Sequence, residues 1–259
     1  MKNIFTKKIR NYFFYDRDNS TYCPVCKKQG MSFSPLPEFY KENAKKYGYQ
    51  YFGCGEMTAL ETYLCPVCGA SDRERLYALW LEQEIKMGVI GKGASFIHFA
   101  PEHALSRKIK SLGYFDYQTA DAMMAGVDHV IDLMNLPFND NSYDFFICSH
   151  VLEHVEDDDL AISELFRVTK KGGRGILMVP IIVGLEKTIE DPSVKTEEER
   201  WRYFGQNDHV RLYAHNDYVR KIKKHGFQLE ELDIKYFGKR VFKQLGLKST
   251  SVLYIVKKP

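Results

Sequence analysis

The sequence lacks any run of about 18 apolar residues, so a helix that crosses a membrane is not expected. Its first ten residues are basic but contain no apolar segment, which argues against a secretory signal. It also lacks an excess of one charge, because the formal net charge of +3 at pH 7 is too small to indicate a nucleic-acid partner by itself. These absences favour a cytoplasmic protein, and they leave its oligomeric state open.

Disulfides are not needed for stability in a chain of this size. With 259 residues, 44% of them hydrophobic, the protein can bury a sizeable core of its own. Its six cysteines are expected to stay reduced in the cytosol. They are not scattered, because one tetrapeptide, Cys-Pro-Val-Cys, occurs at 23–26 and again at 65–68.

Two Cys-x-x-Cys turns can place four thiolates around one metal ion in a tetrahedron, an arrangement that suits zinc. We therefore predict a structural Zn²⁺ held by the four cysteines of the two turns, Cys23, Cys26, Cys65 and Cys68. Four buried reduced thiols, or a redox pair, are the alternatives. Cys54 is a possible replacement ligand, and Cys148, inside an apolar strand, is expected to be a core residue.

From residue 94 onward, short apolar strands alternate with amphipathic helices. The expected strands are 95–100, 115–119, 127–131, 143–149, 175–180, 227–234 and 251–256, and the expected helices are 103–112, 157–170 and 215–225. This alternation predicts an α/β fold with a parallel sheet covered on both faces. The last two strands have no obvious long helix between them and would form an antiparallel edge pair.

The segment before residue 94 has a different character. Residues 20–70 are rich in glycine, proline and tyrosine and are typical of loops and short ribbons. Ser71-Asp72 is a good helix N-cap and Gly88 a good end, with apolar side chains at helical spacing between them. We expect a cysteine-rich zinc-binding module at 1–70, a connecting helix at 71–92 and the α/β domain at 93–259.

Open parallel sheets bind ligands at the carboxyl ends of their strands. An acid about 20 residues beyond the first turn commonly accepts hydrogen bonds from ribose hydroxyls, and Asp121 occupies that place. The other segments that follow the first four strands are Phe99-Ala100-Pro101-Glu102, Asp132-Leu133 and Ser149 to Val155.

These residues carry a resemblance to a known family. The stretch from Asp132 to Pro180 resembles the class I S-adenosylmethionine (SAM)-dependent methyltransferases, in the methyltransferase type 11 group. The matching marks are Leu-Pro-Phe at 136–138, Ser-Tyr-Asp-Phe-Phe-Ile-Cys-Ser-His-Val-Leu-Glu-His-Val at 142–155 and Glu-Leu-Phe-Arg-Val-Thr-Lys-Lys-Gly-Gly at 164–173. The resemblance, over roughly residues 90–259, implies a doubly wound seven-stranded sheet and SAM as the methyl donor.

The resemblance also implies roles for single residues. Asp121 would hold the ribose, Asp132 and the Leu133 backbone would receive the adenine, and Ser149 and His150 would line the cofactor cleft. The family's first turn is usually rich in glycine, whereas residues 99–102 contain none. Glu102 there would accept the cofactor's ammonium group or would only cap the next helix. The turn also lacks the Gly-x-Gly-x-x-Gly of nicotinamide oxidoreductases.

The polar segment Phe204-Gly205-Gln206-Asn207-Asp208-His209-Val210-Arg211 follows the fifth strand and is typical of a substrate-covering loop. His209 would act as a general base oriented by Asp208, and His150 would assist in the cleft. Arg211 would bind an anionic group of the substrate, with His154 beside it. A surface loop with a local Asp–Arg pair is the alternative.

The acceptor of the methyl group is the least defined part of this hypothesis. We expect a small-molecule or sugar-containing, glycan-linked acceptor. A ribosomal RNA methyltransferase with a zinc recognition module is the first alternative, although the modest charge does not favour nucleic acid. A non-catalytic zinc-containing binding protein with a degenerate methyltransferase domain is the second. The basic residues near the N-terminus, Lys2, Lys7, Lys8 and Arg10, are expected to be solvated.

Overall fold

The computed structural model describes residues 20–259, so the basic residues predicted to be solvated at 2–10 lie outside the described part. The chain divides into two compact units. Among the described residues, unit 1 contains 20–36, 57–91 and 232–253, and unit 2 contains 37–56, 92–231 and 254–259. The domain boundaries near residues 70 and 92 stay a prediction, but the grouping differs from it in two places. Residues 37–56 join the sheet unit, and residues 232–253 join the cysteine-rich unit.

A seven-stranded sheet forms the centre of unit 2, with strand order β3-β2-β1-β4-β5-β9-β8. The strands are β1 (Ser95–Phe99), β2 (Asp116–Asp121), β3 (His129–Val130), β4 (Tyr143–Ser149), β5 (Thr169–Met178), β8 (Gln228–Leu232) and β9 (Leu253–Lys257). The first five strands pair in parallel, and β9 runs antiparallel to β5. The doubly wound seven-stranded α/β fold predicted from the sequence is thereby confirmed.

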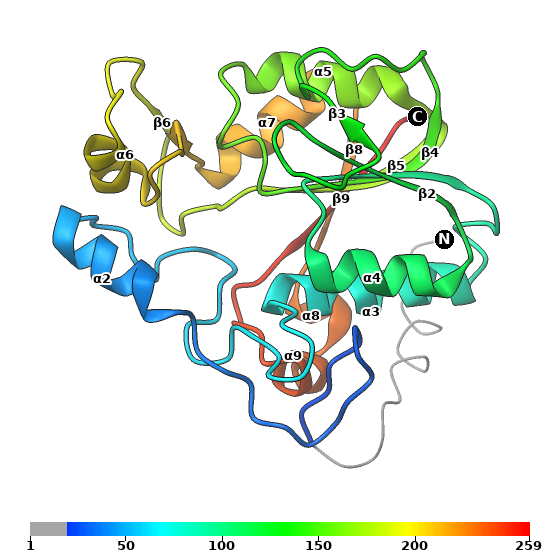
Figure 1. Cartoon of the computed structure of the whole chain (residues 1–259), viewed down its shortest axis with the longest axis horizontal. Coiled ribbons are helices and arrows are strands. Elements are labelled where there is room, and N and C mark those ends of the chain that lie inside the picture. Colours follow the sequence, from blue (N-terminus) through cyan, green and yellow to red (C-terminus); the bar gives the residue numbers. More distant parts are fainter. Residues whose placement is uncertain (1–19) are drawn as a thin grey trace. The chain divides into compact units, whose positions relative to one another are not determined.

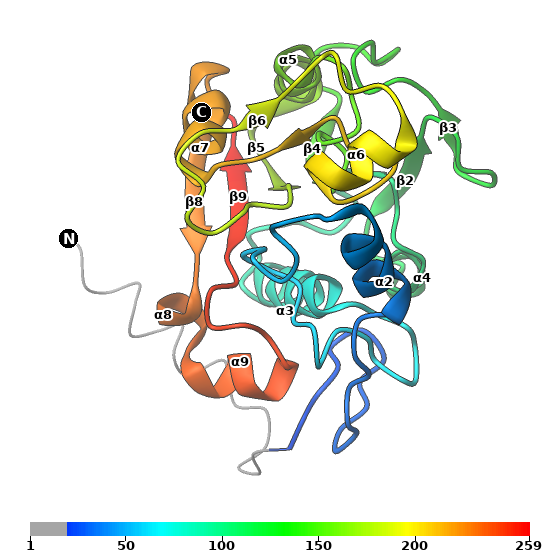
Figure 2. The ribbon, with the colours of Figure 1, turned by 90° about the vertical axis from the view of Figure 1, so that its left-hand side faces the viewer.

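Helices cover both faces of this sheet. In Figure 1, α4 (His103–Leu112) lies on one face, and α5 (Asp158–Val168) and α7 (His215–Lys224) lie on the other. The side of α4 that carries Leu105 and Ile109, four residues apart, is buried as its periodicity requires. Figure 2 shows β8 and β9 side by side, in agreement with the strand order.

The two central strands of the sheet, β1 and β4, are largely buried. Phe96 on β1 packs edge-on against Phe145 on β4, with ring centroids 4.8 Å apart. Cys148 has no exposed surface and is a core residue, as predicted. Buried strands of this kind are typical of a parallel sheet that is covered on both sides.

The junction between α5 and β5 differs from the prediction. The helix was expected to reach residue 170 and the strand to begin at 175, but β5 begins at Thr169. Thr169 is extended, with φ −74° and ψ 133°, and its hydroxyl donates a hydrogen bond to the Leu165 carbonyl. The helix therefore ends at Val168, before the glycines at 172 and 173.

Two helices of unit 2 were not predicted. They are α2 (Glu38–Tyr47) and α6 (Glu197–Phe204), which contact each other, with Tyr47 stacked on Trp201 at 6.0 Å. A second, two-stranded sheet joins β6 (Ile189–Glu190) to β7 (Arg211–Leu212) in antiparallel register. Beside it, Gly205 has φ +81°, and a Cβ atom there would lie 2.6 Å from the Tyr49 ring, so only glycine fits.

Unit 1 is built from the two cysteine turns and three helices, α3 (Asp72–Lys86), α8 (Ile234–Phe237) and α9 (Lys239–Leu245). The helix predicted to begin at Ser71 does so, with Ser71 and Glu74 bonded reciprocally to each other's backbone amides. Helix α9 was missed from the sequence. Within residues 20–259, no helix is long and apolar enough to cross a membrane.

Candidate functional site

Parallel pairing brings the predicted cofactor residues to one edge of the sheet. Phe99 pairs with Ala120 on one side and with Cys148 on the other, so the ends of β1, β2 and β4 are level with one another. The segments that follow these ends begin at Ala100, Asp121 and Ser149. The geometry expected at a ligand-binding edge is therefore present.

The turn after β1 contains no glycine, yet its backbone adopts a conformation that glycine favours. Ala100 has φ +47°, and its amide donates a hydrogen bond to the Ala120 carbonyl. His150, in the corresponding place after β4, has φ +57°. Left-handed residues other than glycine are uncommon and are enriched at functional sites. The turn thus reaches a left-handed backbone conformation at Ala100 without a glycine.

Glu102 follows this turn as the N-cap residue of α4, but its side chain does not cap the helix. Its carboxylate Oε2 lies 2.9 Å from His98 Nε2, while His98 Nδ1 lies 2.8 Å from the Tyr117 hydroxyl. His98 is fully buried with both ring nitrogens bonded, as expected of a core histidine. The alternative that Glu102 only caps the helix is wrong, because its carboxylate contacts His98.

The acids after β2 and β3 shape their own loops. Asp121 Oδ1 accepts hydrogen bonds from the amides of Met123 and Met124, each 2.7 Å long. Asp132 Oδ1 accepts one from the Met134 amide at 2.8 Å. Within the described residues, these contacts use one carboxylate oxygen of each acid and leave the other for a ligand. The Leu133 side chain is buried, so a contact from this residue to a ligand would come from its backbone.

A cluster of histidines surrounds Glu153 in the turn after β4. The Glu153 side chain has no exposed surface, and its Oε1 lies 3.1 Å from His150 Nδ1 and 4.0 Å from His154 Nε2. The ring of His209, from the segment before β7, lies edge-on to the His154 ring with centroids 4.7 Å apart. We call Glu153, His150, His154, His209 and Asp208 the histidine cluster.

The buried position of this cluster determines its protonation. Burial lowers the pKa of His209 to about 4, so its ring is neutral near pH 7. Burial alone would raise the pKa of Glu153, but the neighbouring histidines lower it to about 2. The centre of the cluster is therefore a buried carboxylate beside a neutral imidazole.

The expected pairing of Asp208 with His209 is wrong. Asp208 Oδ2 lies 3.2 Å from His154 Nδ1, and His209 Nδ1 lies 3.2 Å from the Phe204 carbonyl. His209 is only 4% exposed, so its ring does not face a solvent-filled cleft. Their adjacency in the sequence suggested that Asp208 orients His209, but in the fold the two side chains face different partners. Glu153 received no role from the sequence, although His150 three residues before it and His154 directly after it were a signal for it.

Arg211 is also buried, and the fold uses its donors internally. Its guanidinium donates to the backbone carbonyls of Leu152, Val155 and Glu156, and its Nε donates to Glu190 at 2.7 Å. Four of its five N–H groups are thereby occupied. This arrangement disagrees with the prediction that Arg211 binds a substrate anion, because it anchors β7 to the turn after β4.

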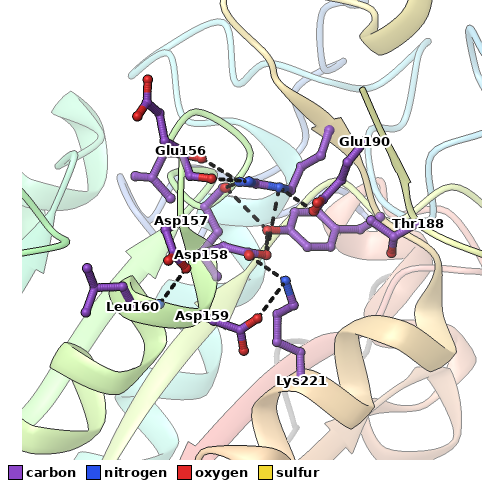
Figure 3. A network of polar contacts seen from close by, with 12 residues as sticks. Glu156, Asp157, Asp158, Asp159, Leu160, Thr188, Glu190 and Lys221 are labelled. Atoms are coloured by element: carbon purple, nitrogen blue, oxygen red, sulfur yellow. Dashed lines mark hydrogen bonds and ion pairs between the residues drawn. The ribbon is translucent and has the colours of Figure 1, made fainter. Parts of the chain in front are cut away.

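Acidic and basic groups extend this network toward α5 and α7 (Figure 3). Lys221 on α7 forms ion pairs with Asp158 and Asp159 at the start of α5, as the dashed lines show. A cavity of about 380 Å³ opens beside these groups, lined in part by Thr188 and Glu190. None of the residues predicted for SAM or substrate lines it.

In unit 1, the four cysteines of the two turns come together as predicted. Cys23 Sγ lies 3.7 Å from Cys68 Sγ, and Cys26 Sγ lies 3.8 Å from Cys65 Sγ. Four sulfurs about 2.3 Å from one zinc ion would lie about 3.8 Å apart in a tetrahedron. The donor set and its spacing therefore fit Zn²⁺. Cys54 is exposed and belongs to unit 2.

The two cysteine turns have the same backbone structure. The amide of Lys27 donates to the Cys23 carbonyl, and the amide of Gly69 donates to the Cys65 carbonyl, in both cases four residues back. Lys27 and Gly69 both have positive φ, 65° and 77°. The repeated tetrapeptide thus forms the same turn twice. The left-handed position after it is occupied by Lys27 in the first turn and by Gly69 in the second.

One family matches a segment that lies almost entirely in unit 2. Residues 90–177 match the family described as "Methyltransferase domain". This segment begins just before β1 and ends within β5, so it contains the strand ends described above.

Relatives match over parts of the chain. The demethylmenaquinone methyltransferase of Streptomyces avermitilis is 48% identical over 46 residues, which are 18% of this chain and 20% of that protein. The ubiquinone/menaquinone biosynthesis C-methyltransferase UbiE of Pasteurella multocida is 31% identical over 100 residues, 34% of this chain and 37% of that protein. The chain thus spans well under half the length of these relatives.

Solved structures resemble the chain weakly. The phosphoethanolamine N-methyltransferase 2 of Haemonchus contortus has 14% identity and a TM-score of 0.46, covering 69% of this chain and 52% of that one. The YcgJ protein of Bacillus subtilis has 17% identity and a TM-score of 0.44, covering 69% and 98%. Likeness at this level does not bear on function.

Proposed function

We propose that the protein is a SAM-dependent methyltransferase. The observation that carries the proposal is the match of residues 90–177 to the methyltransferase domain family, on a sheet whose edge presents Asp121 and Asp132. Each of these carboxylates keeps one oxygen free of hydrogen bonds within the described residues. Asp121 is half-buried and Asp132 is exposed. A carboxylate oxygen without a partner can accept a hydrogen bond from a hydroxyl or amino donor of a nucleoside.

The residues at the strand ends would bind and orient the two reactants. Bound SAM supplies an electrophilic methyl group on a sulfonium. Asp121 would accept hydrogen bonds from the ribose hydroxyls, and Asp132 with the Leu133 backbone would hold the adenine. The turn at 99–102 (Phe99, Ala100, Pro101, Glu102) would lie along the amino-acid end, and Ser149 and His150 would line the cleft near the methyl group. Holding methyl and acceptor in line supplies much of the rate gain in such a displacement.

We propose a small-molecule or glycan-linked acceptor. The relatives that match part of the chain are named as menaquinone and ubiquinone methyltransferases, and these names support an acceptor of the small-molecule class. Arg211 is not part of the proposed acceptor site, since its donors are bonded within the fold. The assignment of His209, Asp208 and His150 to catalysis, and of His154 to acceptor binding, stays a prediction.

We further propose that the four cysteines hold a structural Zn²⁺. The sulfur–sulfur distances of 3.7 and 3.8 Å support it. Four thiolates would leave no coordination position open, so this ion would stabilise unit 1 without taking part in chemistry.

Calorimetric titration with SAM tests the methyltransferase proposal. We expect the wild-type protein to bind SAM, and we expect Asp121→Asn to weaken binding at least about tenfold. The amide keeps one carbonyl oxygen for the Met123 and Met124 amides but no longer presents a charged acceptor to the ribose.

Asp116→Asn is the matched control, because Asp116 is exposed at the opposite end of the same strand. Its affinity for SAM should equal that of the wild type. The absence of binding by the wild-type protein would contradict the proposal, and equal affinities of the Asp121 variant and the wild type would contradict the ribose role of Asp121.

A further inference from the structure

The centre of the histidine cluster contains hydrogen-bond acceptors that no donor satisfies. Within the described residues, neither carboxylate oxygen of Glu153 has a hydrogen-bond partner by the geometric criteria, although Oε1 lies 3.1 Å from His150 Nδ1. His209 Nε2 is likewise buried without a partner. Leaving one such group unsatisfied is costly, and a buried carboxylate without a matching cation is especially unfavourable.

In the rings of His209 and His154, the Nδ1 atom already faces a hydrogen-bond acceptor. His209 Nδ1 faces the Phe204 carbonyl, and His154 Nδ1 faces the Asp208 carboxylate, each at 3.2 Å. A hydrogen donated through Nδ1 leaves the lone pair on Nε2. Metal-binding histidines show this same arrangement, with the ring nitrogen away from the metal bonded to a carboxylate or a backbone carbonyl.

The three remaining donor atoms converge on one point. One carboxylate oxygen of Glu153 and one nitrogen each of His154 and His209 lie within 4.8 Å of one another. Donors about 2.0–2.2 Å from a zinc ion lie about 3–4 Å apart. A contraction of about 1 Å would bring them into range, and the His154 ring, one third exposed, has room to move.

We infer that Glu153, His154 and His209 form a binding site for a divalent first-row transition-metal ion. Two imidazoles and one carboxylate suit such an ion and leave at least one coordination position for water. The site differs from the cysteine cluster, which offers sulfur alone. It would join the turn after β4 to the segment before β7, which also meet where the Val210 amide donates to the Glu153 carbonyl at 2.9 Å.

The stoichiometry of zinc binding tests this site. Chelator-treated, reduced full-length protein is dialysed against Zn²⁺, and the bound metal is measured by atomic emission. Cys23→Ser with Cys26→Ser removes the cysteine cluster but should leave one equivalent bound at the histidine cluster. His154→Ala should bind one equivalent of zinc fewer than the wild type. Glu153→Gln should also bind one equivalent fewer than the wild type. Because the His154 ring is partly exposed, the His154→Ala variant should fold, and circular dichroism would verify that it does.

Two further variants make the result specific. His215→Ala removes a histidine of unit 2 that pairs with Glu231 outside the cluster, and its stoichiometry should equal that of the wild type. Asp208→Asn should keep the stoichiometry but weaken zinc binding about 10- to 100-fold, as expected for the carboxylate that orients a ligand. Wild-type stoichiometry in the His154 variant, or no zinc on the cysteine double variant, would overturn the inference. Neither outcome depends on whether the protein binds SAM.

Discussion

Arg75 illustrates how much one buried residue can organise. It has no exposed surface, and its guanidinium donates to the carbonyls of Thr62, Tyr63, Ala70 and Leu245. Its planar group also stacks on the Phe33 ring at 3.8 Å. These contacts join the second cysteine turn to the end of α9 within unit 1. The sequence offered no signal for them, because the acceptors are backbone atoms up to 170 residues away.

We predict that Arg75→Lys lowers the free energy of unfolding by about 2–3 kcal/mol. A lysine ammonium has three donors and no planar fork, so buried carbonyls would lose their partners and the stacking would be lost. Denaturant unfolding followed by circular dichroism would measure the change. Arg240→Lys, at an exposed position of α9, should change the free energy by no more than about 0.5 kcal/mol. Equal effects of the two substitutions would show that the Arg75 contacts do not stabilise the fold.

Among the elements, α5 and α7 are joined by opposite charges. Asp158 and Asp159 lie in the first turn of α5, and Lys221, Lys224 and His225 lie at the end of α7. Asp159 pairs with Lys224 at 2.9 Å and with His225 at 2.6 Å. Burial would raise the pKa of Asp159, but these partners lower it from 3.8 to about 2. The acids in the first turn of α5 and the basic residues in the last turn of α7 also complement the helix dipoles.

We predict that Asp159→Asn destabilises the fold by about 0.5–1 kcal/mol near pH 5, a small effect because the side chain is one third exposed. A lowered folded-state pKa contributes stability above the unfolded value of 3.8 and loses it as the pH falls toward about 2. The difference between variant and wild type should therefore shrink below about pH 4. Unfolding curves at several pH values would measure it, with Asp116→Asn as the control. A difference that stays constant with pH would contradict the ionic origin.

The helices missed from the sequence were missed for different reasons. Helix α6 had a readable start, because Thr196 and Glu199 form a reciprocal cap, but its polar composition concealed it. Helix α2 has no side-chain cap, and only Ala44 on it is fully buried. Its partner Trp201 lies about 150 residues away along the chain, so the local sequence pattern does little to predict this helix.

At the scale of the whole molecule, the two units draw on distant parts of the chain. The C-terminal segment of unit 1 is bonded to its N-terminal segment, as where the Tyr22 amide donates to the Gln244 carbonyl. No periodicity or composition in one segment specifies a partner so far away. The order along the chain of the strands in the large sheet was therefore predictable, whereas the grouping of the chain into two units was not.

We predict that Cys23→Ser combined with Cys26→Ser loosens unit 1 selectively. Loss of the proposed zinc ion would remove the contact between the two cysteine turns, and structural zinc sites contribute directly to folding. Hydrogen exchange should become faster in residues 20–36 and 57–91. Exchange in β1, β4 and β5 should stay as slow as in the wild type. Uniformly faster exchange would mean that the two units unfold as one, and unchanged exchange would mean that the cysteines do not stabilise unit 1.

The sequence by itself determined the α/β alternation, the strand ends at which Asp121 and Asp132 lie, and the paired cysteine turns. These depend on local periodicity and short spacings, which a single segment carries. Only the tertiary structure decided that Asp208 faces His154, that Arg211 binds carbonyls and that Glu153 lies among three histidines. Those contacts join the turn after β4 to a segment more than 50 residues later. Side-chain direction across such a distance is set by packing, because burial forces each polar group toward whichever partner the fold brings within reach.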